Sequence, residues 1–147
     1  MSASLGMLQA LRAFRAGKLD RHAHVQACAA RAAAIDGWLH AFTYRPTAGD
    51  LAIAEAGPLA GIPVAVKDIF ATADMPTTNG SPVYADHVPD ADAAVVARIR
   101  GLGGSILGKT VTTEFAWRHP GPTVNPWNPA HTPGGSSSGC GRRGRRA

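Results

Sequence analysis

Residues 61–68, Gly-Ile-Pro-Val-Ala-Val-Lys-Asp, form the segment that most constrains the fold of this chain. The β-branched Ile62, Val64 and Val66 alternate with other residues, a period of two that predicts a short β-strand with one apolar face. The opposite face carries small residues and ends in the amine of Lys67. Because ammonium groups are rarely buried without a partner, the lysine at the end of this strand needs an explanation.

Two interpretations of Lys67 compete. In the first, its side chain extends into solvent at the mouth of the strand or pairs with the neighbouring Asp68. In the second, loss of surrounding water turns the amine into a base for catalysis. The residues further along the chain must decide between the two.

The composition indicates a single compact domain of 147 residues with 45% hydrophobic content. A net charge of +5 would by itself suggest a nucleic-acid partner. However, four of these charges come from the arginines near the end of the chain, Arg142, Arg143, Arg145 and Arg146. Since residues 1–141 are close to neutral, we expect no nucleic-acid partner.

Two cysteines, Cys28 and Cys140, are too few for a disulfide framework, and their separation matches no metal-binding motif. The first residues lack the apolar core of a signal peptide, because Arg12 and Arg15 interrupt them, and no apolar run approaches the length of a membrane span. We therefore expect a cytoplasmic protein with no membrane partner.

The first part of the chain predicts two helices. Leucines at near-helical spacing predict a helix over residues 5–17, and a second, alanine-rich helix is expected over residues 20–36 with Asp20 as its N-cap. His22 and His24 lie two positions apart near the start of the second helix, and therefore on different faces. We interpret both as surface residues.

The middle of the chain predicts alternating strands and helices. A strand is expected over residues 39–44, a short helix over 50–56, and a helix capped by Asp90 or Asp92 that runs to Leu102. A strand over residues 105–108 follows. Together with the strand at 61–68, the last helix and strand predict a parallel crossover unit, which favours the α/β class.

Two long segments lack the patterns of regular structure. Residues 71–89 are rich in small and turn-forming residues, and prolines and glycines exclude regular structure over most of 116–139. Long loops in compact domains are usually functional or disordered.

The glycine–serine segment, residues 133–139, has three interpretations. It could be a flexible linker, as its composition alone suggests. It could cradle a phosphate, but it lacks the lysine and spacing of a P-loop. In the third interpretation it is a catalytic loop in which a serine hydroxyl meets Lys67, because consecutive glycines permit unusual backbone conformations and the serines supply hydroxyls.

Six segments of the chain, in this order and spacing, resemble the amidase signature family. They are residues 61–68, 78–81, 104–110, 114–116, 125–129 and 134–139. The resemblance spans most of this chain but only an N-terminal part of a typical member. It implies an α/β fold, the N-terminal part of the amidase-signature fold, in which a mixed β-sheet flanked by helices is incomplete.

The resemblance also implies a mechanism. Lys67 matches the catalytic lysine, and Ser136 matches a bridging serine that follows a cis peptide bond. In family members the neutral amine takes a proton through the bridging serine from a second serine, which attacks an amide carbonyl and forms an acyl-enzyme. Backbone N–H groups stabilise the oxyanion. The expected substrate is a small-molecule amide, and no cofactor is implied.

The remaining site residues follow from the same resemblance. Hydrogen bonds of the loop would involve Gly134, Gly135, Ser137 and Ser138, and the site would be lined by Thr78, Asn79, Gly80 and Ser81. His119 and His131 have no recognisable metal-ligand spacing with Glu114, so no metal is expected. The sequence does not predict the oligomeric state or which amide is cleaved.

The resemblance stops after Gly139. Residues 1–139 are expected to be the N-terminal part of an amidase domain, and residues 140–147 a basic tail foreign to the family, in which members continue with an alanine-rich helix and a loop that holds the nucleophile. Alanine codons read one base out of register encode Gly, Cys, Arg and Ser, so the tail could be a frameshift product. The alternative is a true basic tail that binds nucleic acid or an anionic membrane.

No residue of this chain is therefore assigned as the nucleophile, and we expect the chain to be an inactive, aggregation-prone fragment. A second interpretation is a non-catalytic protein that uses the glycine–serine loop to bind a ligand or as a scaffold. A third, within the family, is the A subunit of a tRNA-dependent glutamine amidotransferase. It ranks lower because residues 117–123 do not resemble that protein.

Overall fold

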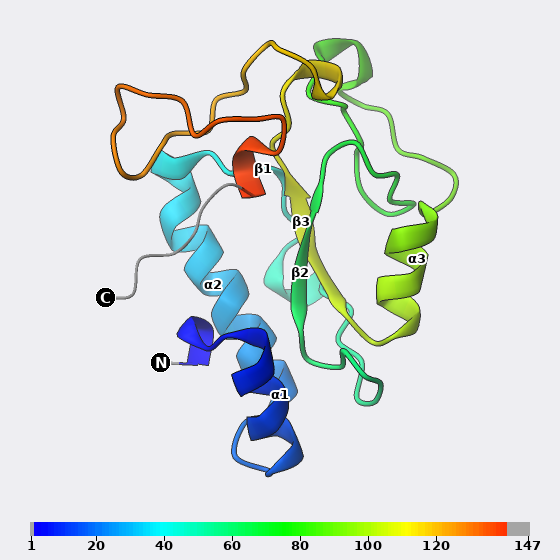
Figure 1. Cartoon of the computed structure of the whole chain (residues 1–147). Helices are drawn as coiled ribbons and strands as arrows, with labels where there is room; N and C mark the ends of the chain where they lie inside the picture. Colours follow the sequence, from blue (N-terminus) through cyan, green and yellow to red (C-terminus); the bar gives the residue numbers. More distant parts are fainter. Residues whose placement is uncertain (1, 141–147) are drawn as a thin grey trace.

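The computed structural model describes residues 2–140 (Figure 1). The tail expected at residues 140–147, whether a frameshift product or a basic binding segment, lies outside the described residues except for Cys140. The helices and strands are α1 (Met7–Arg15), α2 (Arg21–Leu39), β1 (Phe42–Tyr44), β2 (Pro63–Lys67), α3 (Ala94–Gly101) and β3 (Ser105–Thr110). Single 3-10 turns are formed by Ser2–Ser4, Ala48–Asp50, Pro82–Tyr84, Glu114–Ala116 and Ser138–Cys140.

The three strands form a mixed sheet in the order β1-β3-β2. β2 runs parallel to β3, and α3 connects them, so the predicted parallel crossover is confirmed. β1 pairs antiparallel with β3. In Figure 1, α3 lies on one side of the central strands, and α1 and α2 lie on the other. β2 is an edge strand among the residues that the structure describes.

The apolar face predicted for residues 61–68 packs into two buried clusters. Val66 joins Met75, Ile106 of β3 and Val96 of α3. Ile62 instead joins a second cluster, together with Ala10 and Phe14 of α1. The residues of the predicted apolar face therefore divide between the two clusters, because Ile62 lies just before β2 and the strand register shifts between Val64 and Ala65.

α2 begins as predicted and ends later than predicted. The Asp20 carboxylate accepts a hydrogen bond from the Ala23 N–H at 2.7 Å, so Asp20 is the N-cap. The helix continues through Gly37 to Leu39 instead of ending near residue 36. Its end is determined by Asp36, whose carboxylate accepts hydrogen bonds from the backbone N–H groups that follow the helix.

The interpretation of His24 as a surface residue is wrong. Its side chain is 3% exposed, and its ring lies edge-on to Phe14 with centroids 5.5 Å apart. His22 is exposed as expected and lies 3.4 Å from Glu55. The two positions do lie on different faces, but one of those faces packs on α1.

Two further helix predictions need correction. The short helix expected over residues 50–56 does not form: a 3-10 turn ends at Asp50, and residues 51–56 are irregular. The Leu59 N–H, a little further on, donates to the Leu102 carbonyl. Neither Asp90 nor Asp92 caps α3, whose N-cap is Ala93. Asp92 instead accepts from the Ala73 N–H and pairs with the Arg100 guanidinium, which holds the preceding loop to the helix.

The strands β1 and β3 differ in length from their predictions. β1 covers only the last three residues of the expected strand at 39–44, and β3 extends two residues beyond the expected end at 108. The longer β3 matches the full length of β2, because residues 63–67 pair with residues 105–110.

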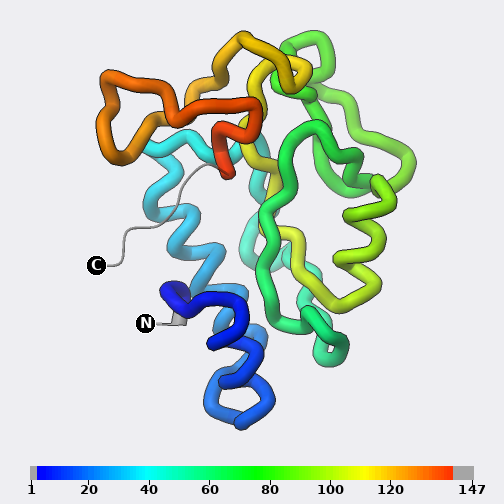
Figure 2. The backbone as a smooth tube through the Cα atoms, viewed as in Figure 1, coloured from blue at the N-terminus to red at the C-terminus, as the bar shows by residue number. Residues whose placement is uncertain are grey.

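Residues 117–137 contain no helix or strand, as predicted. In Figure 2 this loop, coloured gold to red, passes beside the end of α2 and returns to the sheet. The Val124 N–H donates to the Leu39 carbonyl, and the Thr123 hydroxyl donates to the His40 carbonyl. The Gly139 N–H then donates to the Val111 carbonyl just after β3. These contacts bring the glycine–serine segment to the carboxyl end of β2.

None of the helices formed by residues 2–140 combines the length and apolar character needed to cross a bilayer.

Candidate active site

Lys67 and Ser136 meet at the carboxyl end of β2. The Lys67 Nζ donates a hydrogen bond to the Ser136 Oγ at 2.6 Å, although the two residues are 69 positions apart. Both side chains are half-buried. Asp68 is not the partner of Lys67, because its carboxylate forms an ion pair with Lys109 instead. The sequence interpretation in which the lysine meets a serine hydroxyl therefore matches the geometry.

The glycine–serine segment holds Ser136 through its backbone. The peptide bond between Gly135 and Ser136 is cis, as the family resemblance implies. The Ser136 carbonyl accepts from the Thr113 N–H at 3.0 Å. The Ser138 hydroxyl donates to the Gly134 carbonyl at 2.9 Å, which closes the loop on itself. A side chain at Gly135 would lie 2.8 Å from the Thr113 methyl group, so the loop fits closely against the chain after β3.

Ser137 and Ser138 contribute differently to this loop. Ser138 is buried and uses its hydroxyl in the bond just described. Ser137 is exposed, and its carbonyl accepts from the Cys140 N–H at 3.1 Å. The Thr110 hydroxyl lies 3.0 Å from the Cys140 sulfur, and this contact holds the end of the loop against β3.

The segment 78–81 is held against Asp68. The Thr78 hydroxyl and N–H both donate to the Asp68 carboxylate, and the Asn79 N–H donates to the Asp68 carbonyl. Asn79 adopts the left-handed conformation with φ of 54°. The residue that follows the predicted base therefore organises this whole segment.

Gly80 and Ser81 contact the chain just after β3. An added Cβ at Gly80 would lie 2.9 Å from the Thr112 carbonyl. The Ser81 hydroxyl donates to the Glu114 carboxylate at 2.7 Å. Thr78, Gly80 and Ser81 border a hollow of about 300 Å³ that Thr112 also lines. The structure thus places the segment beside residues 112–114, next to the backbone that binds Ser136.

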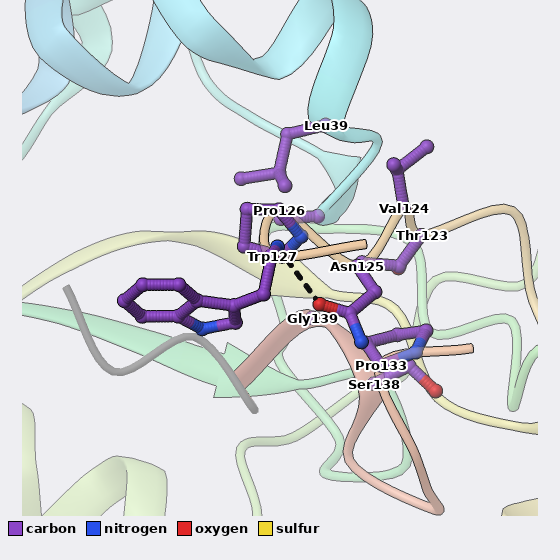
Figure 3. A pocket seen from close by; sticks show the side chains of 10 residues that line it. Leu39, Thr123, Val124, Asn125, Pro126, Trp127, Pro133, Ser138 and Gly139 are labelled. Atoms are coloured by element: carbon purple, nitrogen blue, oxygen red, sulfur yellow. Dashed lines mark hydrogen bonds between the residues drawn. The ribbon is translucent and has the colours of Figure 1, made fainter. Parts of the chain in front are cut away.

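A smaller pocket of about 80 Å³ lies beside the glycine–serine loop (Figure 3). Ser138 and Gly139 form part of its wall, and Leu39 at the end of α2 forms another part. The Asn125 side-chain carbonyl accepts from the Trp127 N–H at 2.9 Å, the dashed line in Figure 3. Since ligand pockets usually measure roughly 300–1,000 Å³, this one fits only a small group.

The sequence analysis did not identify the buried pair of Lys109 and Asp68. Both side chains are fully buried, and the Lys109 Nζ lies 3.2 Å from the Asp68 Oδ1. Burial lowers the pKa of Lys109, an effect that the Asp68 carboxylate opposes. The available signal was a second lysine within an apolar strand pattern, Ser-Ile-Leu-Gly-Lys-Thr-Val at residues 105–111.

No group of three or more histidine, cysteine or acidic side chains within residues 2–140 is arranged to hold a metal ion.

Comparison with known proteins places this geometry in a family. Residues 23–142 match the Amidase family. This chain belongs to that family. Structures of family members agree with its fold, so the assignment to the N-terminal part of the amidase-signature fold is confirmed. The peptide amidase from Stenotrophomonas maltophilia is 33% identical, with a TM-score of 0.78 over 93% of this chain and 33% of that one.

The curated relatives carry a more specific name, the A subunit of glutamyl-tRNA(Gln) amidotransferase. The relative from Acidothermus cellulolyticus is 45% identical over 126 residues, which cover 74% of this chain and 25% of that protein. The relative of the same name from Thermobifida fusca is 40% identical over 146 residues, 86% of this chain and 29% of that protein. This amidase chain therefore spans about a quarter of the length of these relatives. The sequence analysis ranked the A subunit of a tRNA-dependent glutamine amidotransferase lower than a general amidase. The names of these relatives do not support that ranking.

Proposed function

We propose that this chain supplies the lysine base and the bridging serine of an amidase-type hydrolase that cleaves a carboxamide C–N bond through an acyl-enzyme. Lys67 is the base, and Ser136 is the bridge. The observation that carries this proposal is the 2.6 Å hydrogen bond between the Lys67 Nζ and the Ser136 Oγ. Membership of the Amidase family supports the reaction class.

The roles follow from the direction in which protons move. The neutral Lys67 amine accepts the Ser136 hydroxyl proton while Ser136 takes a proton from a nucleophilic serine. The serine attacks the amide carbonyl, and the lysine returns the proton through Ser136 to the leaving amine. Water then hydrolyses the acyl-enzyme, and the acid leaves. Each step moves one proton along the same pair of hydrogen bonds.

We further propose that the 147 residues do not hydrolyse amides by themselves, because no residue among them is assigned as the nucleophile. Residues 1–139 would be the N-terminal part of an amidase domain, and residues 140–147 would be a separate basic tail, of which the family match includes the first three residues. No cofactor has a role in this chemistry. Thr78, Asn79, Gly80 and Ser81 would line the substrate side of the site, and Gly134, Gly135, Ser137 and Ser138 would hold the bridge.

A chimera tests the proposal directly. Residues 23–139 of this chain replace the aligned segment of the Stenotrophomonas maltophilia peptide amidase, which supplies the rest of the domain. We expect the chimera to hydrolyse a peptide amide, and Lys67→Ala or Ser136→Ala to reduce kcat by a factor of about 10³ or more, since loss of a base or its relay affects the chemical step.

Arg31→Ala is the control within the grafted segment, since Arg31 is exposed on α2 and has no proposed role in the site. Its kcat should remain within a few-fold of the parent chimera. A folded chimera that stays active after Lys67→Ala would overturn the proposed roles. In that case the alternative of a non-catalytic ligand-binding or scaffold protein gains support.

A second candidate is the amidotransferase component named in the curated relatives, and the 45% identity favours it. In this case the amide would be glutamine and the ammonia would pass to a charged tRNA. The expectation of no nucleic-acid partner would then not hold for the assembled enzyme. A matching chimera in the Acidothermus cellulolyticus relative should show glutaminase activity, whereas a preference for peptide amides would contradict this candidate.

A further inference from the structure

The turn that begins at Lys67 is closed by a hydrogen bond within the backbone. The Phe70 N–H donates to the Lys67 carbonyl at 3.0 Å, so the chain reverses direction immediately after β2. Asp68 lies inside this turn, and its N–H donates to the Thr110 carbonyl of β3. The position of the Lys67 backbone therefore depends on what holds this turn in place.

Lys109 binds this turn from the buried side of the sheet. Its Nζ lies 3.2 Å from the Asp68 carboxylate and donates to the Phe70 carbonyl at 2.9 Å. The same amine donates to the Pro76 carbonyl at 3.3 Å and to the Thr77 hydroxyl. One buried cation therefore connects both ends of residues 68–77 to β3.

The strand register keeps the two lysines apart. Val66 pairs with Lys109, and Lys67 pairs with Thr110. Since directly paired residues of neighbouring strands point to the same face and successive residues alternate, Lys109 shares the buried face with Val66, and Lys67 projects to the opposite face. The Lys109 amine therefore lies on the face of the sheet opposite to the hydrogen bond between Lys67 and Ser136.

We propose that Lys109 is a positioning residue for the lysine base: it clamps the turn at residues 67–70 and so holds the Lys67 amine against the Ser136 hydroxyl. This inference rests on the proposed function for its relevance to catalysis. A buried ammonium gains from several acceptors at once, because each unpaired polar group in the interior is costly. Without Lys109, the Asp68 carboxylate would keep only its hydrogen bonds from Thr78, and the Phe70 and Pro76 carbonyls would lose this donor.

The chain contains three lysines, Lys18, Lys67 and Lys109, which makes a direct measurement simple. Lysine labelled with ¹³C at Cε gives one NMR signal for each, and single substitutions assign them. The Lys67 signal reports its contact with Ser136 as the change in chemical shift caused by Ser136→Ala. We expect this change to be clear in the parent chain and absent in Lys109→Met, while the exposed Lys18 signal stays in place.

Thr77→Val provides a milder variant, because it keeps the side-chain volume and leaves the other three acceptors of Lys109 in place. It removes the Thr77 hydroxyl as an acceptor of Lys109, together with the 3.4 Å hydrogen bond from that hydroxyl to the Phe70 carbonyl. We expect it to reduce the effect of Ser136→Ala on the Lys67 signal. If Lys109→Met does not give a cooperative melt, Thr77→Val decides the question. Thr72→Val is the matched control, since the Thr72 hydroxyl is equally buried in the same loop but makes no hydrogen bond to the Lys109 amine. It donates to the Met75 carbonyl at 3.2 Å and lies 3.5 Å from the Thr77 hydroxyl, so this variant removes a neighbour of Thr77 and leaves the acceptors of Lys109 in place.

The outcomes separate the two proposals. The positioning role would be overturned if Ser136→Ala shifted the Lys67 signal in folded Lys109→Met as much as in the parent chain. If Lys109→Met does not fold, the same result in Thr77→Val would overturn it. The proposed function would remain intact in either case. The positioning role would also be overturned if Thr77→Val and Thr72→Val reduced the effect of Ser136→Ala on the Lys67 signal equally. Removal of any buried hydroxyl from the loop would then be enough to displace Lys67. If Ser136→Ala does not move the Lys67 signal in the parent chain, the proposed function itself fails.

Discussion

At the scale of single residues, two lysines at adjacent strand ends have opposite environments. Lys67 is half-buried and donates to a hydroxyl, whereas Lys109 is fully buried among a carboxylate, a hydroxyl and two carbonyls. Both end a stretch of apolar strand, so their sequence contexts are similar. The difference arises from register, because Lys109 pairs with Val66 and Lys67 pairs with Thr110. Successive residues along a strand face opposite sides of the sheet, so the two lysines do as well.

The lowered pKa of Lys109 predicts how stability depends on pH. Burial lowers its pKa in the folded state, so the folded protein loses this proton at a lower pH than the unfolded chain, whose lysines titrate at about 10.4. Between those two values the unfolded state binds more protons, and the free energy of unfolding rises with pH. Below the lowered pKa, the full cost of charging Lys109 is present in the folded state.

Urea unfolding measured at a series of alkaline pH values checks this prediction. The stability of the parent chain relative to Lys109→Met should increase as the pH approaches about 10.4. The comparison with Lys109→Met removes the contributions of other titrating groups that both proteins share. A relative stability that falls over this range would show that Asp68 outweighs burial in the folded state.

At the scale of elements, the return of the long loop to the sheet depends on one glycine. The Gly139 N–H donates to the Val111 carbonyl, and the Val111 N–H donates to the Ala41 carbonyl. A Cβ at Gly139 would overlap the Ala41 carbonyl oxygen. The close approach of these backbones brings the glycine–serine segment to β2, so a side chain here would push Ser136 away from Lys67.

Gly139→Ala should therefore destabilise the fold by about 1–3 kcal/mol, the usual cost of overpacking. Gly37→Ala is the matched control, because Gly37 lies inside α2 and an added Cβ would meet nothing within 4 Å. That control should stabilise the fold by about 0.5–1 kcal/mol, since alanine is the better helix former. Thermal melts of both variants compare the two effects, and equal shifts would contradict the packing argument.

At the scale of the whole molecule, the sheet ends on an open strand. β2 has a neighbour on one side only within residues 2–140, and Ala65 in its middle is exposed. Large apolar side chains such as Val83, Trp117 and Trp127 are 60–80% exposed. Unpaired strand edges and exposed apolar surface favour association between copies, as the sequence analysis expects.

A charge placed on this edge should reduce association. We expect Ala65→Lys to slow the growth of light scattering in concentrated solution, because lysine on an edge strand opposes pairing with another strand. Ala30→Lys adds the same charge at an exposed position of α2 and serves as the control. Similar suppression by both variants would mean that net charge, not the open edge of β2, controls association.

The sequence alone determined the features that depend on neighbouring residues. The period of two placed a strand at residues 61–68, Asp20 marked the start of α2, and the order of strand, helix and strand predicted the parallel crossover. These predictions succeed because pleating, capping and parallel connection are set by local backbone geometry. Lys67 and Ser136, 69 positions apart, were instead singled out by the family resemblance, and the structure brings them together.

Only the tertiary structure decided which polar groups are buried and what they bind. His24 resembles any polar residue near a helix start until α1 covers it, and Lys109 resembles Lys67 until the register turns it inward. The end of α2 was set by the Asp36 carboxylate and the chain that follows, not by Gly37. The physical reason is that burial of a polar group depends on partners far away in the sequence, whose arrangement exists only once the chain has folded.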